Sequence, residues 1–353
     1  TLKFEKLFSN YIDPLGQTYA ISLSSCTAAL HLSVKALDIG IGDEVITTPL
    51  SFVATANAII HAGARPIFVD INKETFNINP DLIEEKITSK TKAILPVHFA
   101  GRSCEMDKIT EIANKYNLKV IEDAAHAIEA KYKGKKIGAI GDLTCFSFYA
   151  TKNMTTAEGG MVTTRDKAIA DKIKNLSLHG LNADAWSRYS DIGYKHYLAI
   201  SHGFKYNMTD IHSSLGIHQL SRLDENLKKR ERIWKIYNSA FKDLPVFLPK
   251  EEDGKNLHAR HLYKLILNLD ELNITRDQFL DALYQENIGS GVHYIPIHLH
   301  PIYQVYGYKR GDFSNAEFIG DRTVSVPLSP ALTEKDVQDV IDTVTKILTY
   351  YRK

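Results

Sequence analysis

Apolar positions along the chain form two patterns that alternate from residue 19 to residue 164. Short apolar runs, which are typical of buried strands, are separated by segments with apolar residues at helical spacing. Leu30, Val34 and Leu37, for example, recur at i, i+4 and i+7 and predict a helix after the first strand. The predicted strands are 19–23, 44–48, 65–71, 92–99, 118–123, 143–149 and 161–164.

Helices are predicted between these strands, among them 51–62, one beginning at Pro80 with Asn79 as its cap, 106–116 and 169–178. Strands separated by helices of this length favour right-handed βαβ units and a mainly parallel sheet. Ligands of such sheets bind outside the carboxyl ends of the strands. His98, Asp123 and Lys152 all fall near such ends. We therefore expect a site there.

The C-terminal part follows a different pattern, after a long helix that starts near Thr209 and ends near Pro245. It indicates a small α+β domain that packs on a large α/β domain, and we place these at 241–353 and 1–240. A hairpin at 131–141 and a long loop at 179–210, rich in aromatic residues and histidine, interrupt the large domain. The predicted C-terminal elements are strand 261–269, helix 275–287, strands 290–297 and 323–327, and helix 333–350.

Composition excludes several classes of protein. The 353 residues carry a net charge of +1, so no global field indicates nucleic acid or an acidic membrane as a partner. The three scattered cysteines fit a reducing cytoplasm and predict no disulfide framework and no cysteine-based zinc site. No apolar run approaches the roughly 20 residues of a spanning helix. The chain begins at Thr1 in what reads as the middle of a helix, so we expect an incomplete N-terminal segment.

The segment 143–160, LTCFSFYATKNMTTAEGG, carries the most informative residue. Lys152 follows the buried strand and has small and hydroxyl residues around it. Desolvation at such a position disfavours the ammonium form and lowers the pKa, and the free amine can form a Schiff base with a carbonyl. The alternative for Lys152 alone is an ordinary lysine on a solvated loop.

Two other segments supply groups that a Schiff-base cofactor would need. Residues 24–27, SSCT, open a helix, where they are either a plain cap or an anion site for a phosphate. Asp123, at a buried strand end, is either a capping or ion-paired carboxylate or the partner of a pyridinium nitrogen. Pyridoxal phosphate combines a lysine Schiff base with such a carboxylate partner, and it is the cofactor that we predict.

Four segments in order along the chain carry a family resemblance: SSCTAALHL (24–32), EDAAHA (122–127), SFYATKNMTTAEGG (147–160) and GFKYNMTDIHSSLG (203–216). They resemble the signature segments of the DegT/DnrJ/EryC group of PLP-dependent sugar aminotransferases. The resemblance runs from about residue 20 to residue 330. It implies the transferase fold type I and a cytoplasmic homodimer with shared active sites.

The resemblance also implies roles for individual residues. Lys152 would bind pyridoxal phosphate and move the proton in catalysis, and Asp123 would pair with the pyridine nitrogen. His126 would lie near the phenolic oxygen, and Phe52 would stack on the ring. The phosphate would be held by Cys26, Thr27 and Ser147 and by Asn207 of the neighbouring subunit.

Within the family, residues 179–189 and GVHY (291–294) look most like the enzymes that aminate C4 of nucleotide-linked 4-ketosugars, such as the 4-amino-4-deoxy-arabinose aminotransferases. The implied reaction moves an amino group from L-glutamate, through pyridoxamine phosphate, to a nucleotide-linked ketosugar in cell-surface polysaccharide or lipopolysaccharide biosynthesis. The candidates for contacts with sugar or diphosphate are Tyr149, Arg188, His293, Tyr294 and His298; packing or a surface hydrogen bond is the alternative for each.

Three other functions compete with this one. A sugar dehydratase could use the same cofactor, but those relatives carry histidine at the position of Lys152. A zinc-dependent hydrolase could use His298 and His300, although no carboxylate or cysteine stands at ligand spacing beside them. A non-catalytic member of the fold would bind a partner instead. We therefore predict an aminotransferase without a metal.

Overall fold

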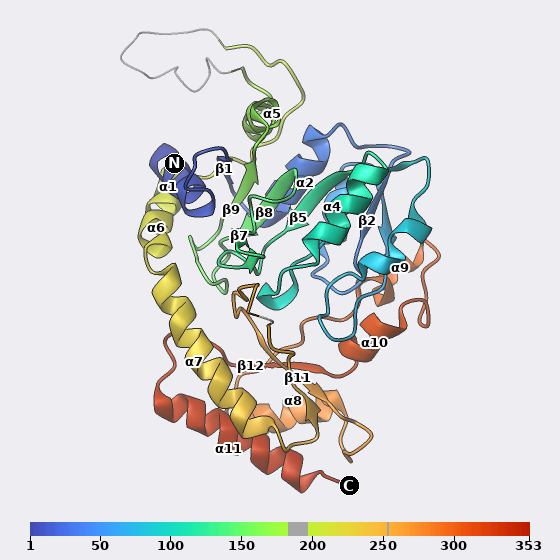
Figure 1. Ribbon diagram of the computed structural model, residues 1–353, viewed down its shortest axis with the longest axis vertical. Helices are drawn as coiled ribbons and strands as arrows, with labels where there is room; N and C mark the ends of the chain where they lie inside the picture. Colours follow the sequence, from blue (N-terminus) through green and yellow to red (C-terminus); the bar gives the residue numbers. More distant parts are fainter. Residues whose placement is uncertain (183–196, 253) are drawn as a thin grey trace.

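The computed structural model describes residues 1–182, 197–252 and 254–353, and its centre is a sheet of seven strands (Figure 1). The strands are β1 (Tyr19–Leu23), β2 (Glu44–Thr47), β3 (Arg65–Phe68), β4 (Thr91–Leu95), β5 (Lys119–Asp123), β8 (Leu143–Ser147) and β9 (Gly160–Thr164). Their order is β1-β9-β8-β5-β4-β2-β3. Among these seven strands, β9 alone runs in the opposite direction to the other six. The mainly parallel mixed sheet is thus confirmed.

Helices cover both faces of the sheet because its strands are apolar on both sides. In β8, for example, Cys145 packs toward one layer of helices and Phe146 toward the other. The first layer contains α2 (Cys26–Ala36), α3 (Ala54–His61) and α5 (Lys167–Ser177); the second contains α1 (Leu2–Ile12) and α4 (Met106–Lys115). The large part of the molecule is therefore a three-layer α/β unit.

Two consecutive helices, α6 (Asp210–Leu220) and α7 (Leu223–Phe241), lead from this unit to the C-terminal part (Figure 1). That part has a three-stranded antiparallel sheet, β10 (Val246–Phe247), β11 (Tyr263–Leu267) and β12 (Thr323–Val326), with α8 (Arg276–Gln285) and α11 (Glu334–Tyr350). Trp234 and Tyr237 of α7 are buried in the core of this part. The predicted boundary at residue 240 stays an interpretation, since the second half of α7 packs with the C-terminal elements.

Three predicted elements are wrong. The single long helix predicted from Thr209 to Pro245 is two helices, α6 and α7, separated by a turn at residues 221–222. In the predicted strand 290–297, Gly291 pairs with Ser325, but the following residues turn away toward the large part, and Ile297–Leu299 is a short 3-10 helix. The predicted helix after Pro80 is a pair of 3-10 turns, Pro80–Leu82 and Glu84–Lys86, although Asn79 caps it as expected. The remaining elements are β6 (Lys131–Tyr132), β7 (Lys135–Lys136), the 3-10 turn Phe99–Gly101, α9 (Pro301–Gln304) and α10 (Ser314–Gly320).

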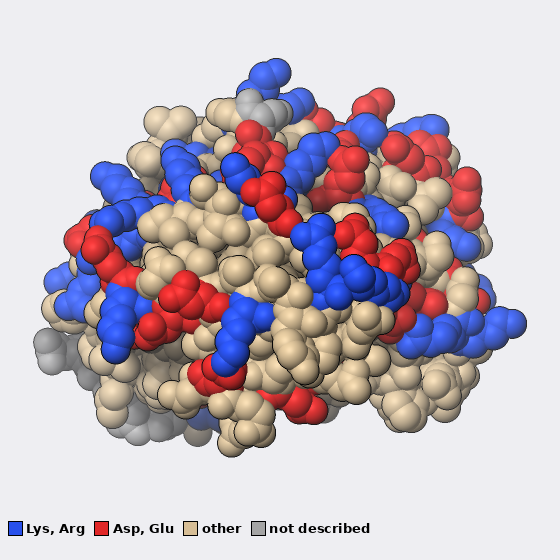
Figure 2. All heavy atoms as spheres, turned by 90° about the horizontal axis from the view of Figure 1, so that it is seen from below, with Lys and Arg blue, Asp and Glu red and all other residues tan. Residues whose placement is uncertain are grey.

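On the face of the molecule shown in Figure 2, charged side chains are mixed rather than gathered by sign. Figure 2, which shows the end of the molecule that carries α8 and α11, has acidic and basic residues interspersed among neutral ones. This agrees with a net charge of +1. No helix among the described residues is long and apolar enough to cross a membrane.

Candidate active site

A cavity of about 740 Å³ lies at the carboxyl ends of β5 and β8, where it is closed from the other side by residues of the C-terminal part. Strand topology explains the location, since the ends of parallel strands meet at one edge of the sheet. Ten of the predicted site residues line it: Cys26, Thr27, Phe52, Asp123, His126, Ser147, Tyr149, Lys152, His293 and Tyr294. The sequence therefore located the cavity from segments far apart in the chain.

Lys152 lies in the turn that follows β8. Its backbone N–H donates to the carbonyl of Tyr149 at 2.9 Å, and buried Phe148 and Met154 hold the turn on the core. Burial lowers the pKa of the Lys152 amine, and the nearby Cys26 thiol and Asp123 carboxylate counter this effect. A larger share of neutral amine, which is the nucleophilic form, results near neutral pH.

Asp123 is the last residue of β5 and is buried. Its Oδ2 accepts a hydrogen bond from the Thr55 hydroxyl at 2.8 Å, and its Oδ1 accepts one from the backbone N–H of Ala125 at 3.1 Å. Burial raises the pKa of this carboxyl, while Thr55, Ala125 and Lys152 lower it. A carboxylate has about four lone-pair positions, so Asp123 keeps acceptor capacity for a cationic N–H donor in the cavity.

The first turn of α2 forms a third wall of the cavity. Ser25 caps the helix by accepting from the N–H of Ala28 at 3.0 Å, as the cap interpretation of this segment predicts. Gly160 allows β9 to approach this turn, because a Cβ there would lie 2.4 Å from the backbone of Ser25. Cys26 and Thr27 follow the cap, so their N–H groups and the helix dipole lie beside the cavity.

His126 and Tyr294 meet across the cavity from the two parts of the molecule. The N–H of Ala100 donates to His126 Nδ1 at 3.2 Å, so in the neutral ring the proton is on Nε2. His126 Nε2 lies 3.2 Å from the Tyr294 hydroxyl oxygen. The Nε2–H group donates to this oxygen, so the Tyr294 hydroxyl keeps its own proton to donate elsewhere. Burial lowers the pKa of His126 well below its usual range, which keeps the ring neutral.

His293 lies beside His126 and Tyr294, and a residue of β12 holds its ring in place. Its Nδ1 is 2.8 Å from the Ser325 hydroxyl oxygen. Burial, together with the charges of Lys152 and Lys264, lowers the pKa of His293 to about 4. This ring is therefore neutral at physiological pH.

Five polar residues of the cavity were not predicted as site residues from the sequence: Ser51, Thr55, Thr151, Glu158 and His261. Thr55 sits within the predicted helix 51–62, so its place opposite Asp123 depends on how that helix packs on the sheet. Glu158 belongs to the TTAEGG segment that follows Lys152. Its closeness to Lys152 in the sequence was a signal that could have identified it as a site residue. His261 is on a segment more than 100 residues from Lys152, and only the fold brings the two together.

Two predicted residues lie apart from the cavity, and a third lies outside the described residues. His298 is fully buried, with Nε2 2.9 Å from Glu317 Oε1, so we do not retain it as a substrate contact. Asn207 pairs with Leu23 across the edge of β1 and borders a different hollow, which also contains Asp210. Arg188 falls among the residues that are not described.

Two hypotheses about buried histidines change with this geometry. His98 Nε2 lies 2.8 Å from Glu122 Oε2, and both side chains are fully buried beneath the cavity, so His98 supports the fold. His298 pairs with Glu317, and no group of three or more potential metal ligands is gathered within the described ranges. The zinc hypothesis therefore gains no support.

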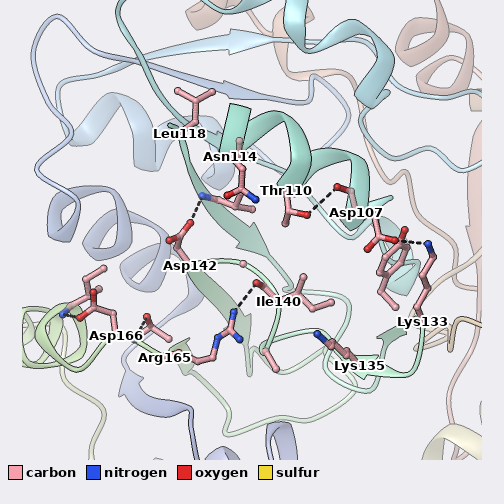
Figure 3. A pocket seen from close by; sticks show the side chains of 17 residues that line it. Asp107, Thr110, Asn114, Leu118, Lys133, Lys135, Ile140, Asp142, Arg165 and Asp166 are labelled. Carbon is pink, nitrogen blue, oxygen red and sulfur yellow. Dashed lines mark hydrogen bonds and ion pairs between the residues drawn. The ribbon is translucent and has the colours of Figure 1, made fainter. Parts of the chain in front are cut away.

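A second hollow of about 730 Å³ lies at the other end of the same strands (Figure 3). It is bordered by the start of β5, the residue before β8 and the end of β9. Several of its charged groups have partners: Lys133 pairs with Asp107, and Asp142 accepts from the neighbouring Lys119 and from the N–H of Val120. No convergence of desolvated groups comparable to that around Lys152 occurs among its described residues.

The residues of the first cavity fit pyridoxal phosphate. Lys152 supplies an amine with a lowered pKa, and Asp123 supplies a buried carboxylate with spare acceptor capacity. The first turn of α2 supplies an anion site, and Gly160 lets β9 lie close to this turn. When bound, this cofactor supplies an electron sink for the transfer of an amino group.

Comparison with known proteins agrees with this fit. A model of the DegT/DnrJ/EryC1/StrS aminotransferase family matches residues 1–345. The chain is 56% identical to the uncharacterized protein MJ1066 of Methanocaldococcus jannaschii over 353 residues, covering 100% of this chain and 91% of that protein. It is 49% identical to the spore coat polysaccharide biosynthesis protein SpsC of Bacillus subtilis over 350 residues, covering 98% and 89%.

Among solved structures, the fold matches Spr1654 of Streptococcus pneumoniae, a candidate sugar aminotransferase in its PMP form. The TM-score is 0.92 at 32% identity, with 99% of this chain and 92% of that one covered. The fold is thus that of the fold type I transferases. The chain belongs to the DegT/DnrJ/EryC1/StrS aminotransferase family.

Proposed function

We propose that the protein is a pyridoxal phosphate-dependent aminotransferase that moves an amino group from L-glutamate to the keto carbon of a nucleotide-linked ketosugar. The observation that carries this proposal is the cavity in which the Lys152 amine, the buried Asp123 carboxylate and the first turn of α2 converge. Membership of the aminotransferase family supports it. Solved forms of Spr1654 with PMP and with PLP support the choice of cofactor.

Lys152 and Asp123 have the central roles. The Lys152 amine binds the cofactor and, once released, carries a proton to and from the reacting carbon, for which a lowered pKa is suited. Asp123 holds a proton on the ring nitrogen through a charge-assisted hydrogen bond. Thr55 and the N–H of Ala125 fix the carboxylate for this contact.

The remaining cofactor contacts follow the cavity walls. Thr27, Cys26 and Ser147 bind the phosphate, and Phe52 and His126 bound the ring. Phe52 is 57% exposed, and its ring centroid is 5.9 Å from that of Tyr294. One face of the Phe52 ring is therefore available to stack on the cofactor ring.

Tyr149, His293 and Tyr294 are our candidates for contacts with the sugar. Each lines the cavity, and Tyr294 keeps its hydroxyl proton to donate to a ligand, because His126 Nε2 donates to its oxygen. The segment GVHY, to which two of these belong, resembles the C4-specific enzymes, so we favour C4 over C3. Arg188 remains a proposed diphosphate contact on the basis of bidentate geometry.

We further propose a homodimer in which Asn207 reaches the phosphate site of the partner subunit. Asn207 precedes α6, whose Ile211 is 76% exposed and whose Leu215 is 45% exposed. Exposed apolar side chains on one helix, next to a predicted cross-subunit residue, favour a subunit contact at α6.

SpsC is named for spore coat polysaccharide biosynthesis. A role in making aminosugars for a cell-surface polysaccharide, carried out in the cytoplasm, is the corresponding proposal for this chain. Its three cysteines are all free and buried, which suits a reducing compartment.

An acceptor screen tests the function. The protein, loaded with PLP, is incubated with L-glutamate and with UDP- or dTDP-linked 4-keto- and 3-keto-6-deoxyhexoses, and 2-oxoglutarate and aminosugar are measured by mass spectrometry. We expect both products in equal amounts with a 4-ketosugar. Deoxygenated sugar without amine would indicate the dehydratase, and no conversion of glutamate by the loaded protein would contradict the proposal.

A further inference from the structure

Three buried side chains and the half-buried Asn153 form a continuous chain of hydrogen bonds that ends at the cavity. The Arg230 guanidinium of α7 donates to Glu129 Oε1, and these two groups are 2% and 0% exposed. Asn153, the residue after Lys152, donates to Glu129 Oε2 at 2.8 Å. The Oδ1 of Asn153 lies 2.8 Å from Nδ1 of His261, which lines the cavity. The chain thus links the helix between the two parts to the loop of Lys152.

These contacts fix the position of the proton on His261. The Asn153 amide nitrogen has two protons, and both are used, by Glu129 Oε2 and by the Ala259 carbonyl at 2.9 Å. The amide oxygen therefore faces His261, and because it can only accept, His261 Nδ1 must carry the proton. In a neutral ring, the lone pair is then on Nε2.

The two neighbouring histidines of the cavity, His126 and His261, therefore have opposite tautomers. The ring centroids of His126 and His261 are 4.4 Å apart. His126 accepts at Nδ1 and donates from Nε2, whereas His261 donates from Nδ1. Burial, Lys152 and His293 together lower the pKa of His261 well below its usual range, so the ring stays neutral. Nε2 is then the polar atom that His261 can offer to a ligand.

We infer that His261 is a specificity-determining residue whose Nε2 accepts a hydrogen bond from a hydroxyl group of the bound sugar, with its tautomer set by Asn153, Glu129 and Arg230. This inference rests on the proposed function, because it assigns the group to the sugar substrate.

A hydroxyl is the donor that this environment favours. Lys152 and Arg230 are close enough to His261 to affect its pKa, so a cationic ligand group there would meet like charges. A neutral O–H donor meets no such repulsion and satisfies the lone pair. A sugar that lacks this hydroxyl would leave Nε2 unpaired, which selects against it.

Nitrogen NMR of the histidine rings tests the tautomer without any substrate. The PLP-loaded protein, labelled with ¹⁵N-histidine, is compared with His261→Gln to assign the signal. We expect a protonated Nδ1 and an unprotonated Nε2 at pH 7. A proton on Nε2 would overturn the inference.

Matched substitutions test the contact with the sugar. His261→Asn keeps an amide near the position of Nδ1 and removes the acceptor at Nε2, whereas His261→Gln can place an amide oxygen near Nε2. We expect His261→Asn to raise KM for the ketosugar identified in the screen by about tenfold, the cost of one hydrogen bond, with a smaller change in KM for L-glutamate. His261→Gln should recover part of the loss.

The two proposals can fail separately. If His261→Asn leaves KM for the sugar unchanged while the wild-type protein turns over, the inference is wrong and the proposed function stands. If the wild-type protein does not accept an amino group from L-glutamate, the proposed function fails, and the sugar assignment of His261 fails with it.

Discussion

The two hollows at opposite ends of β5 and β8 have nearly the same volume, about 740 and 730 Å³, but different chemistry. In the first, polar groups from distant segments point at a common space without neutralising one another. In the second, Lys133 pairs with Asp107 (Figure 3), and Asp142 pairs with Lys119 beside the hollow. Volume alone therefore does not distinguish a site.

Two lysines make the difference concrete. Burial lowers the pKa of Lys152, whereas the hydrogen bond from Lys133 to Asp107 raises the pKa of Lys133. The first lysine is shifted toward the reactive amine, and the second is held as an ammonium ion. The comparison teaches that desolvation without a full counter-charge is what prepares a group for chemistry.

The largest effect is expected for Lys152→Ala. Removal of the amine removes both the cofactor bond and the proton carrier, so turnover should fall at least about 1000-fold, or about 4 kcal/mol in activation free energy. Steady-state assays and the visible absorbance of bound PLP measure it. Lys133→Ala, in the second hollow, is the matched control and should retain activity; equal losses in both variants would erase the contrast between the hollows.

Asp123→Asn should have the next largest effect. Asparagine can still accept from Thr55 but has no charge to hold a proton on the ring nitrogen, so kcat/KM should fall about 100-fold. Asp142→Asn, which changes a carboxylate of the second hollow, serves as the control. A loss below threefold for Asp123→Asn would show that the buried carboxylate is not the partner of the ring.

The histidines of the first cavity should make the protein sensitive to acid. The pKa of His293 is about 4 in the folded state, below its usual value of 6.5, so the unfolded chain binds more protons and stability falls as the pH drops from 6.5 toward 4. For this residue the loss between pH 8 and pH 5 is about 2 kcal/mol. Urea unfolding of the cofactor-free protein should show this loss, and His293→Asn should reduce it. An unchanged pH dependence in the variant would mean that His293 is not held neutral.

Changes in the second hollow should have the smallest effects. Lys135 and Arg165 line it, and Arg165 donates to the carbonyl of Ile140 at 3.3 Å. Exposed contacts of this kind contribute about 0–1 kcal/mol. Lys135→Ala and Arg165→Ala should change kcat/KM less than twofold and the unfolding midpoint only slightly. A tenfold loss of activity would give this hollow a function.

The sequence predicted the parts of the fold and site that depend on local pattern. The buried strand that ends in Asp123 and the one that leads to the turn of Lys152 are visible as apolar runs, and parallel topology then brings the two residues to one edge. The cap at Ser25 follows from residue type. These features need only short-range information and a rule about sheets.

The rest depends on long-range packing that a pattern does not contain. Thr55 and His261 reach the cavity because a helix and a linker pack in particular orientations. His298 looked like a ligand beside His300, but its partner Glu317 comes from a later helix. The segment 290–297 has the composition of a strand, yet packing against the large part turns it into the cavity wall.

Reduction of the PLP-loaded protein with borohydride, followed by peptide mass spectrometry, tests the central claim most directly, because it fixes the cofactor to the amine that holds it. The expected result is one phosphopyridoxyl group per chain, on the peptide that contains Lys152. A group on Lys133 or Lys135, or no labelled peptide at all, would contradict the assignment of the first cavity as the active site.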